Sequence, residues 1–375
     1  MPKKMDLLKK LRQPLILNAI KSMGDNFETK NPLIVELDPT QACDLACPSC
    51  ISEDMVSINK RLSSKRLLDL AYEFYNNKVK GVILIGGGEP LLHPAIGDFI
   101  KYSGEHDIHI GITTNGTMID RYLEIISQHA SWTRISVDAS TSKTYNILRP
   151  AKAGKSKFKR VIKNIELLSK NKKGKLGYSF LLQTPADGHS VVSNIHEIYD
   201  AALLAREIGC DYFEVKPSYQ FRKGVDHSLM VHENHFMEEA KYEISRLDEL
   251  VTKDFSVMKA INLDFSLLGA ESKQIKTYAE CPAAELRTLI CPSGVYVCPY
   301  WRGKDHMLIG DINNQSLKSL WSSDLRKQVM KKLNPRIHCN FHCLRHESNL
   351  EIIKLRRDIK SKKIIKKIID YDRFI

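Results

Sequence analysis

Residues 33–50 read LIVELDPTQACDLACPSC, and this stretch decides the fold class. Its first five residues form a short run of β-branched and apolar side chains, which is typical of a buried strand. Cys43, Cys47 and Cys50 then follow in one loop after Pro39. A functional site is therefore expected in the loop at the end of this strand.

Short apolar runs and longer amphipathic stretches alternate from this strand onward. Strands are expected at 33–37, 82–85, 108–113, 134–137, 178–183 and 212–216. Helices are expected at 64–77, 96–104, 119–128, 158–170 and 192–208. This alternation predicts an α/β protein whose parallel sheet is covered by helices and binds ligands at the carboxyl ends of its strands. Six units are too few for a complete eight-stranded barrel, so we expect a partial (β/α)6 TIM-like barrel.

The chain is expected to divide into five parts. A smaller cysteine-rich, cluster-binding domain follows the barrel, since its cysteines are dense and its hydrophobic pattern is less periodic. The parts are a helical extension (1–32), the barrel (33–230), a helical connection (231–280) with a helix at 233–250, the cysteine-rich domain (281–345) and a basic amphipathic tail (346–375).

Composition excludes several classes of protein. The 375 residues are 43% hydrophobic and 27% charged, which is near the globular average and unlike a disulfide scaffold, a disordered chain or collagen. Apolar runs are short, and lysines interrupt the N-terminus, so neither a membrane span nor a secretory signal is expected. We expect a cytoplasmic protein, in which nine cysteines point to metal ligation or redox chemistry.

Most of the net charge of +13 lies at the two ends. Residues 1–12 hold five basic side chains against one acidic, and residues 354–367 hold eight against one. The tail also carries isoleucines at helical spacing. It could contact an anionic partner, or it could be a solvated helix that packs through its isoleucines. No aromatic-rich basic module is present, so nucleic-acid binding is not expected.

The first three cysteines suit an inorganic cluster. Thiolates at the spacing of Cys43, Cys47 and Cys50 can hold an iron–sulfur cluster within one loop. Three ligands leave one iron of a four-iron cube open for another ligand. The alternatives are a zinc site completed by a histidine or a distant cysteine, and three unrelated thiols.

This cysteine spacing after the first strand resembles the signature of the radical S-adenosylmethionine (radical SAM) family. The resemblance implies a [4Fe-4S] cluster whose unique iron chelates S-adenosylmethionine (SAM). It implies that the reduced cluster cleaves SAM to a 5'-deoxyadenosyl radical, which abstracts hydrogen from a substrate. An electron donor such as flavodoxin or ferredoxin is implied as well. Ser49 departs from the aromatic residue often found before the third cysteine, so no adenine contact is assigned there.

Further positions match the same family at the ends of the next strands. The run 86–90, GGGEP, resembles the glycine motif whose backbone and acid would hold the SAM ammonium group. Asn115 and Arg149 could instead be a turn residue or a helix cap. The residues that the resemblance assigns to cofactor binding are Gly87, Gly88, Glu89, Pro90, Asn115, the ribose contacts Ser136 and Asp138, and Arg149, which would approach the SAM carboxylate.

The distal cysteines resemble the auxiliary-cluster extension called SPASM, or its reduced twitch form. Gly294 precedes Cys298 by one residue fewer than usual, and the full set of cysteines is absent, so one auxiliary [4Fe-4S] cluster is expected. A zinc knuckle is the alternative. The expected ligands are Cys281, Cys298, Cys339 and Cys343, with Cys291 replacing one of them or standing spare.

Two residues near the sixth strand are candidates for catalysis. Cys210 is either a buried small hydrophobe or a hydrogen-atom donor of the kind that an epimerase needs. Lys216 is either a substrate-side acid, base or anion contact, or part of a salt bridge at the rim.

The function predicted first is a radical SAM enzyme that oxidises or epimerises a small molecule, such as a sugar or aminocyclitol. A small molecule is preferred because about 32 residues before the first strand are too few for a leader-peptide-binding domain. The alternatives are a peptide-modifying radical SAM/SPASM maturase, which could recruit a separate recognition protein, an RNA-modifying enzyme, and an iron–sulfur protein that only transfers electrons.

Overall fold

The structure is a computed structural model of the 375-residue chain. It describes residues 3–4, 7–185, 192–219, 232–268, 274–368 and 374. The expected boundary between barrel and connection, at residues 230 and 231, lies outside the described residues.

One curved sheet organises the molecule. Its order is β1-β8-β7-β6-β5-β4-β3-β2-β9-β10-β11, and pairing is parallel from β1 to β9 and antiparallel from β9 to β11. The strands are β1 (Lys3–Lys4), β2 (Ile34–Leu37), β3 (Gly81–Leu84), β4 (His109–Thr114), β5 (Ala130–Ser136), β6 (Lys175–Leu181), β7 (Tyr212–Lys216), β8 (Ser256–Lys259), β9 (Arg287–Cys291), β10 (Gly294–Tyr296) and β11 (Leu308–Gly310).

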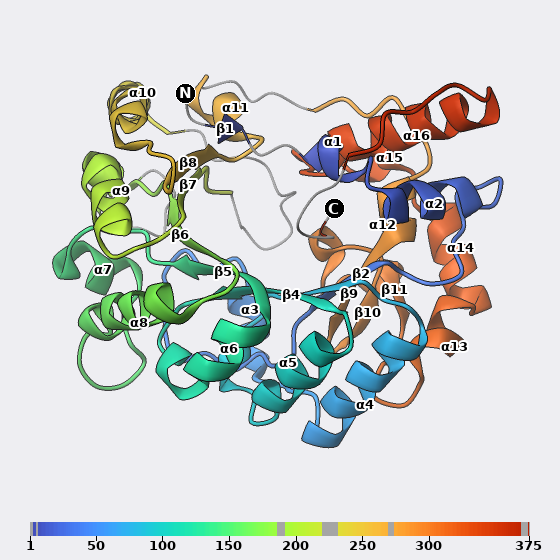
Figure 1. Ribbon diagram of the computed structural model, residues 1–375, viewed down its shortest axis with the longest axis horizontal. Coiled ribbons are helices and arrows are strands. Elements are labelled where there is room, and N and C mark those ends of the chain that lie inside the picture. The colour runs from blue at the N-terminus through green and yellow to red at the C-terminus, as the bar shows by residue number, and fades with distance from the viewer. Residues whose placement is uncertain are drawn as a thin grey trace.

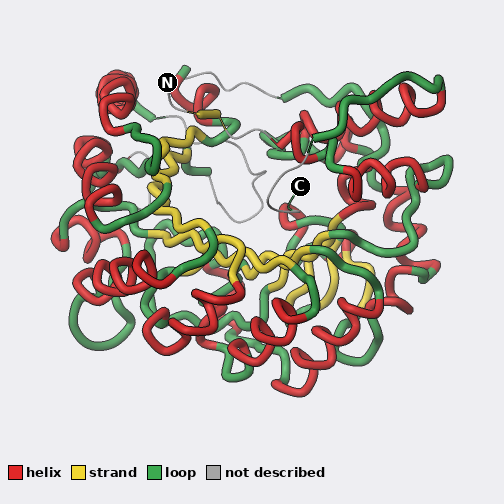
Figure 2. The backbone as a smooth tube through the Cα atoms, viewed as in Figure 1, coloured by secondary structure: helices red, strands yellow, loops and turns green. Residues whose placement is uncertain are grey.

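Helices cover the convex face of this sheet, which forms an open arc in Figure 2. Those of the barrel follow the arc from α4 to α9, and α12 to α16 lie at its other end (Figure 1). The α-helices are α1 (Leu7–Lys10), α2 (Pro14–Ser22), α3 (Glu53–Ile58), α4 (Ser64–Asn76), α5 (Ile96–Glu105), α6 (Leu123–His129), α7 (Ser142–Leu148), α8 (Phe158–Asn171), α9 (Ile198–Glu207), α10 (Asn234–Arg246), α11 (Leu263–Leu267), α12 (Pro282–Leu286), α13 (Leu317–Trp321), α14 (Asp324–Lys332), α15 (Pro335–His338) and α16 (His346–Lys360).

The main core lies between the strands and the outer helices. On β7, Phe213 and Val215 are fully buried in this core, while Glu214 and Lys216 alternate with them on the inner face of the sheet. Phe74 of α4 and Phe99 of α5 pack edge to face, with ring centroids 6.1 Å apart. Alternation along β7 thus directs apolar side chains to the helices and polar ones to the inside of the arc.

The partial barrel predicted from the sequence is confirmed, since β2 to β7 are the six expected strands in parallel order. Two features of the sheet were not predicted. Strand β8 forms inside the expected helical connection and pairs with β7 and β1. Strand β9 of the cysteine-rich part pairs in parallel with β2, so this part continues the barrel sheet. Pairings between such distant segments leave no local sequence signal.

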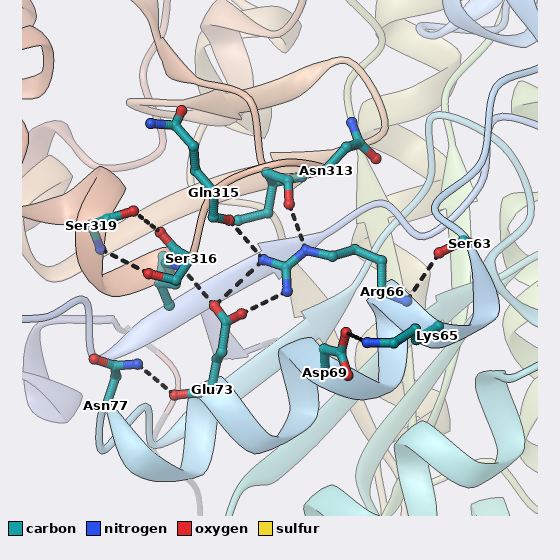
Figure 3. A network of polar contacts seen from close by, with 12 residues as sticks. Ser63, Lys65, Arg66, Asp69, Glu73, Asn77, Asn313, Gln315, Ser316 and Ser319 are labelled. Carbon is teal, nitrogen blue, oxygen red and sulfur yellow. Dashed lines mark hydrogen bonds and ion pairs between the residues drawn. The ribbon is translucent and has the colours of Figure 1, made fainter.

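A polar network fastens the cysteine-rich part to the barrel (Figure 3). Arg66 on α4 donates to the carbonyl oxygen of Gln315 at 3.0 Å and pairs with Glu73, with 2.6 Å between Nη1 and Oε1. Glu73 Oε2 accepts the backbone N–H of Leu317 at 2.6 Å, at the first residue of α13. Helix α4 therefore holds the segment that leads into α13.

The basic tail is only partly the amphipathic helix that we expected. Helix α16 ends at Lys360 and buries Ile352 and Leu355 against a second core beside α2 and α12. Ile364 lies beyond the helix and is fully exposed. Phe374 is buried near the first residues of the strands, where its ring lies 5.4 Å from that of Trp132. No helix in the described ranges has the length and apolar character needed to cross a membrane.

Candidate active site

The three proximal cysteines lie in the loop that follows β2, at the carboxyl end of the barrel strands. Backbone bonds fasten this loop to the segment after α7: Ala46 donates to Pro150 at 2.8 Å, and Lys152 donates to Asp44 at 2.9 Å. The Cys50 amide donates to the Cys47 carbonyl at 3.2 Å. The loop is thus held at both ends while its thiols stay free.

The proximal thiols fit a cationic metal cluster. Burial raises the pKa of Cys43 to about 12 and that of Cys47 to about 11, and repulsion between neighbouring thiolates adds to both shifts. Burial also raises the pKa of Cys50. Three partly buried thiols that repel one another when ionised are stabilised by a positive group between them, and a [4Fe-4S] cluster would supply it.

The glycine loop follows β3 and packs directly on the cysteine loop. A Cβ on Gly88 would lie 2.2 Å from the Ala42 carbonyl oxygen, so only glycine fits there. The Glu89 amide donates to the same oxygen at 2.7 Å. Gly87 donates its amide to the buried Asp38 carboxylate. Gly88 and Glu89 therefore lie against the residue just before Cys43, and Gly87 lies against Asp38 at the end of β2.

Glu89 joins this loop to the end of β4. Its carboxylate accepts from the Thr114 hydroxyl and the Asn115 amide, each at 2.7 Å, and from the Leu91 amide at 3.1 Å. Burial raises its pKa to about 7. Asn115 donates through Nδ2 to Asp44 at 2.8 Å, and that nitrogen lies 4.0 Å from Cys43 Sγ. Both residues hold the loops together, and their contacts with SAM stay predictions.

Asp138 and Arg149 form the next polar pair at the carboxyl ends of the barrel strands. Asp138 follows β5 in a left-handed conformation with φ of 61°, and its carboxylate accepts two hydrogen bonds from the Arg149 guanidinium. Its other oxygen accepts the Leu181 amide at 2.8 Å. Arg149 Nη1 lies 3.9 Å from Cys47 Sγ, which places positive charge beside the thiols. Ser136 ends β5 two residues before Asp138.

Four of the five distal cysteines lie close together. Cys298 and Cys339 each interact electrostatically with Cys281 and Cys343, and with each other, and burial raises the pKa of all four thiols. They come from separate positions along the chain: the start of α12, the end of β10, the end of α15 and the turn before α16. A SPASM-type auxiliary [4Fe-4S] cluster fits this set, because each of its irons takes one thiolate.

Polar groups surround the distal set. Asn349 Nδ2 lies 3.5 Å from Cys281 Sγ, and the Arg345 amide donates to Cys343 Sγ at 3.3 Å. Lys276 donates to the Phe341 carbonyl oxygen between the last two cysteines. In the described parts of the chain, no three His, Cys, Asp or Glu side chains are arranged to hold a single metal ion. In a four-iron cube, by contrast, every thiolate binds its own iron.

Cys291 lies apart from these four cysteines. It is fully buried on β9, and its thiol contacts the Ser293 hydroxyl at 3.1 Å. Its electrostatic neighbours are Asp38 and Arg302. The geometry therefore favours the prediction that Cys291 is spare.

Arg302 connects the auxiliary part to the SAM end of the barrel. Its Nε lies 3.0 Å from Asp38 Oδ2, and its Nη1 donates to the Ser52 hydroxyl at 3.0 Å and to the Gly86 carbonyl at 3.3 Å. It follows Cys298 by four residues, and Ser52 follows Cys50 by two. Arg302 and Asp38 were not predicted from the sequence, because a contact between residues this far apart has no local pattern.

The two predicted catalytic residues lie at opposite ends of β7. Lys216 ends the strand on the inner face, where Asp138 and Arg149 affect its pKa; burial is the main cause that lowers this pKa to about 8. Cys210 precedes the strand and is buried in the core under α9, with its pKa raised by burial. The structure brings Lys216 to the site but not Cys210, so the position of Cys210 fits a core residue.

Comparison with known proteins identifies the family of the barrel segment. The family model for the Radical SAM superfamily matches residues 37–187, from the end of β2 past β6. Residues 37–187 are a radical SAM domain. The chain is therefore an enzyme that uses a [4Fe-4S] cluster and SAM.

Several relatives extend the match along the chain. Mycofactocin maturase MftC of Mycobacterium tuberculosis is 23% identical over 300 residues, which cover 78% of this chain and 71% of MftC. The antilisterial bacteriocin subtilosin biosynthesis protein AlbA of Bacillus subtilis is 24% identical over 337 residues, 88% of this chain and 67% of AlbA. Streptococcus suis SuiB bound to precursor peptide SuiA shares the fold, with a TM-score of 0.58 and 16% identity over 82% of this chain and 68% of SuiB. These matches support the SPASM-type auxiliary domain.

Proposed function

We propose that this radical SAM enzyme modifies a peptide, as a maturase with one auxiliary cluster. The observation that carries the proposal is the similarity to a protein named as a maturase over 78% of this chain. The names of AlbA and of the SuiB complex point to peptide products and substrates in the same way. The preference for a sugar or aminocyclitol thus gives way to the alternative weighed beside it. Chain length before the first strand is a poor guide to the substrate, because a separate protein can recognise a leader peptide.

The residues at the carboxyl ends of the barrel strands have distinct roles in this proposal. When bound, a reduced [4Fe-4S] cluster and SAM would supply radical chemistry for hydrogen abstraction from the peptide. Cys43, Cys47 and Cys50 would hold that cluster, and the glycine loop would bind the amino end of SAM. Arg149, oriented by Asp138, keeps positive charge beside Cys47 at 3.9 Å. The inner faces of β5 to β7 then remain for the substrate.

The test uses a set of candidate precursor peptides, including the product of any short reading frame found near the gene for this protein. Each peptide is incubated anaerobically with reconstituted enzyme, SAM and dithionite, and both the peptide mass and 5'-deoxyadenosine are measured. We expect one peptide to change mass in step with 5'-deoxyadenosine formation. The variant with Cys43, Cys47 and Cys50 all changed to Ala should do neither. Turnover of sugars or aminocyclitols with every peptide left unchanged would overturn the proposal.

Electron supply and location belong to the same proposal. We propose flavodoxin or ferredoxin as the electron donor, and an oxidoreductase-type reaction in the cytoplasm. All nine cysteines are free, which suits a reducing compartment. Replacing dithionite by reduced flavodoxin in the peptide assay tests the donor, and activity is expected with both.

A further inference from the structure

The inner face of β5, β6 and β7 carries polar side chains that the cofactor assignments leave unused. In the register of these parallel strands, Ser136 pairs with Ser179, and Ser179 pairs with Glu214. The three residues therefore form one row across the sheet. Lys216 lies two residues beyond Glu214 on the same face, about 7 Å nearer the carboxyl end. Ser136, the predicted ribose contact, is one end of this row.

An ion pair spans this face from β5 to β7. Arg134 Nη1 donates to Glu214 Oε2 at 3.0 Å, and Arg134 Nη2 donates to the Thr113 hydroxyl at 3.2 Å. The pair crosses β6 at Gly177, which faces Arg134 in the register and has no side chain to block it. Glu214 is 2% exposed. Its negative charge is thus already neutralised by Arg134.

Lys216 remains as an unmatched positive charge. Across the described ranges, its ammonium group has no hydrogen-bond or ion-pair partner. The nearby acids are each engaged: Glu214 pairs with Arg134, and Asp138 pairs with Arg149. An ammonium group inside a protein costs free energy unless an anion approaches it.

Two further donors on this face also have no partner. Ser179 is fully buried, and its hydroxyl makes no hydrogen bond with the described residues. It lies on the inner face, since Tyr178 and Phe180 on either side of it are in the core under the helices. Arg134 Nε is likewise unpaired. Buried donors without acceptors are uncommon in native proteins, and a bound ligand, ion or water is one explanation for them.

We propose that Lys216 and Ser179, next to the Arg134–Glu214 pair, form a subsite that binds a carboxylate of the peptide substrate. This inference rests on the proposed function. A lysine ammonium and a serine hydroxyl together suit one monoanionic acceptor, and in an unmodified peptide such an acceptor is a carboxylate. The carboxylate can belong to the peptide C-terminus or to an Asp or Glu side chain.

The experiment measures which probes the reconstituted enzyme retains in the presence of SAM, by affinity selection and mass spectrometry. The first tripeptide library has a free C-terminus and no Asp or Glu. The second has an amidated C-terminus and contains Asp or Glu, and the third is amidated and contains neither. A fourth set holds small non-peptide carboxylic acids. Wild-type enzyme should retain the first or second library about tenfold or more over the third, and the one retained identifies the source of the carboxylate.

Variants assign the selectivity to the subsite. Lys216→Met should abolish the preference for probes with a carboxylate, and Ser179→Ala should reduce that preference. Lys216→Arg keeps the positive charge and should retain most of it. Lys259→Met is the matched control, because Lys259 pairs in register with Val215 and lies on the helix-covered face. Circular dichroism and SAM binding show that each variant is folded. Loss of SAM binding in Lys216→Met would overturn the inference, since Lys216 would then serve the cofactor.

The remaining outcomes separate the subsite from the proposed function. Equal retention of the three libraries, or a preference unchanged in Lys216→Met, would overturn the subsite and leave peptide modification standing. Retention of the small acids alone, lost in Lys216→Met, would keep a carboxylate subsite and contradict a peptide substrate. Retention of no probe by enzyme that binds SAM would contradict both.

Discussion

At the scale of single residues, Gly88 controls how the glycine loop meets the cysteine loop. Its added methyl in Gly88→Ala would contact backbone atoms of residues 41 and 42, which cannot move aside as a flexible side chain can. We expect the free energy of unfolding to fall by about 1–3 kcal/mol and SAM binding to weaken. Urea unfolding and calorimetric titration with SAM measure the two effects.

The control for this variant is Gly24→Ala, whose added methyl is closest to the carboxylate at the end of the Glu28 side chain. That side chain can move, so the stability and SAM affinity of Gly24→Ala should match the wild type. Normal SAM binding in Gly88→Ala would show that the close approach of the two loops is not required.

The residues of the site differ in how visible they were in the sequence. Cys43, Cys47 and Cys50 were predictable because one short loop holds them all at a fixed spacing. Arg302 and Ser179 were not predictable, because the neighbours that give each of them a role lie on other strands or in another part of the chain. The spacing of residues in the sequence predicts a site that lies within one segment. A site formed across paired strands can be predicted only when the pairing register of those strands is known.

At the scale of elements, Glu197 holds the start of α7, the helix that leads to Arg149. Its carboxylate accepts from the backbone N–H and hydroxyl groups of Ser140 and Thr141 and from the Thr144 hydroxyl. These hydrogen bonds outweigh the burial of Glu197, which acts in the opposite direction, and lower its pKa. The charged form is therefore favoured in the folded state.

Changing Glu197 to Gln tests this role. At pH 7 the variant should lose about 1–3 kcal/mol of unfolding free energy, measured by urea denaturation. The native pKa lies below the unfolded value, so this contribution is full above the unfolded pKa and is lost as the pH falls through the native one. The difference in unfolding free energy between Glu197→Gln and the wild type should therefore become smaller at acid pH. The control is Glu207→Gln at an exposed position on α9, which should change the unfolding free energy little at either pH. If the difference between Glu197→Gln and the wild type does not depend on pH, the charge of Glu197 does not stabilise the fold.

The elements of the barrel were largely predictable, because its strands and helices alternate with clear periods. The predicted strand 212–216 matches β7 residue for residue, and the predicted start of α4 is also correct. Strand β8 was missed because it lies in a stretch dominated by α10. The isoleucines of the tail keep helical spacing beyond Lys360, but helix α16 ends at that residue, so the spacing alone does not give the end of the helix.

At the scale of the whole molecule, Arg302 couples the auxiliary domain to the SAM end of the barrel. Removing it would leave Asp38, which is fully buried, without its ion-pair partner. We expect Arg302→Met to destabilise the protein by about 3–5 kcal/mol and to increase hydrogen exchange in residues 43–52. Thermal unfolding and hydrogen-exchange mass spectrometry measure both.

A double-mutant cycle with Asp38→Asn assigns this cost to the pair. Arg302→Met should cost less in the Asp38→Asn background, because no buried charge is then left behind. Lys65→Met, which removes an exposed ion pair with Asp69, is the control and should lose less than about 1 kcal/mol. Additive effects of the two substitutions would show that Arg302 and Asp38 act independently.

We expect two separate cysteine sets to hold two clusters, one for SAM and one auxiliary. Iron and acid-labile sulfide per chain are measured after anaerobic reconstitution, in wild type and in two multiple variants. One variant has Cys43, Cys47 and Cys50 changed to Ala, and the other has the same change at Cys281, Cys298, Cys339 and Cys343. We expect about eight irons in the wild type and about four in each variant. About four irons in the wild type, with zinc or no metal in the distal set, would contradict the account.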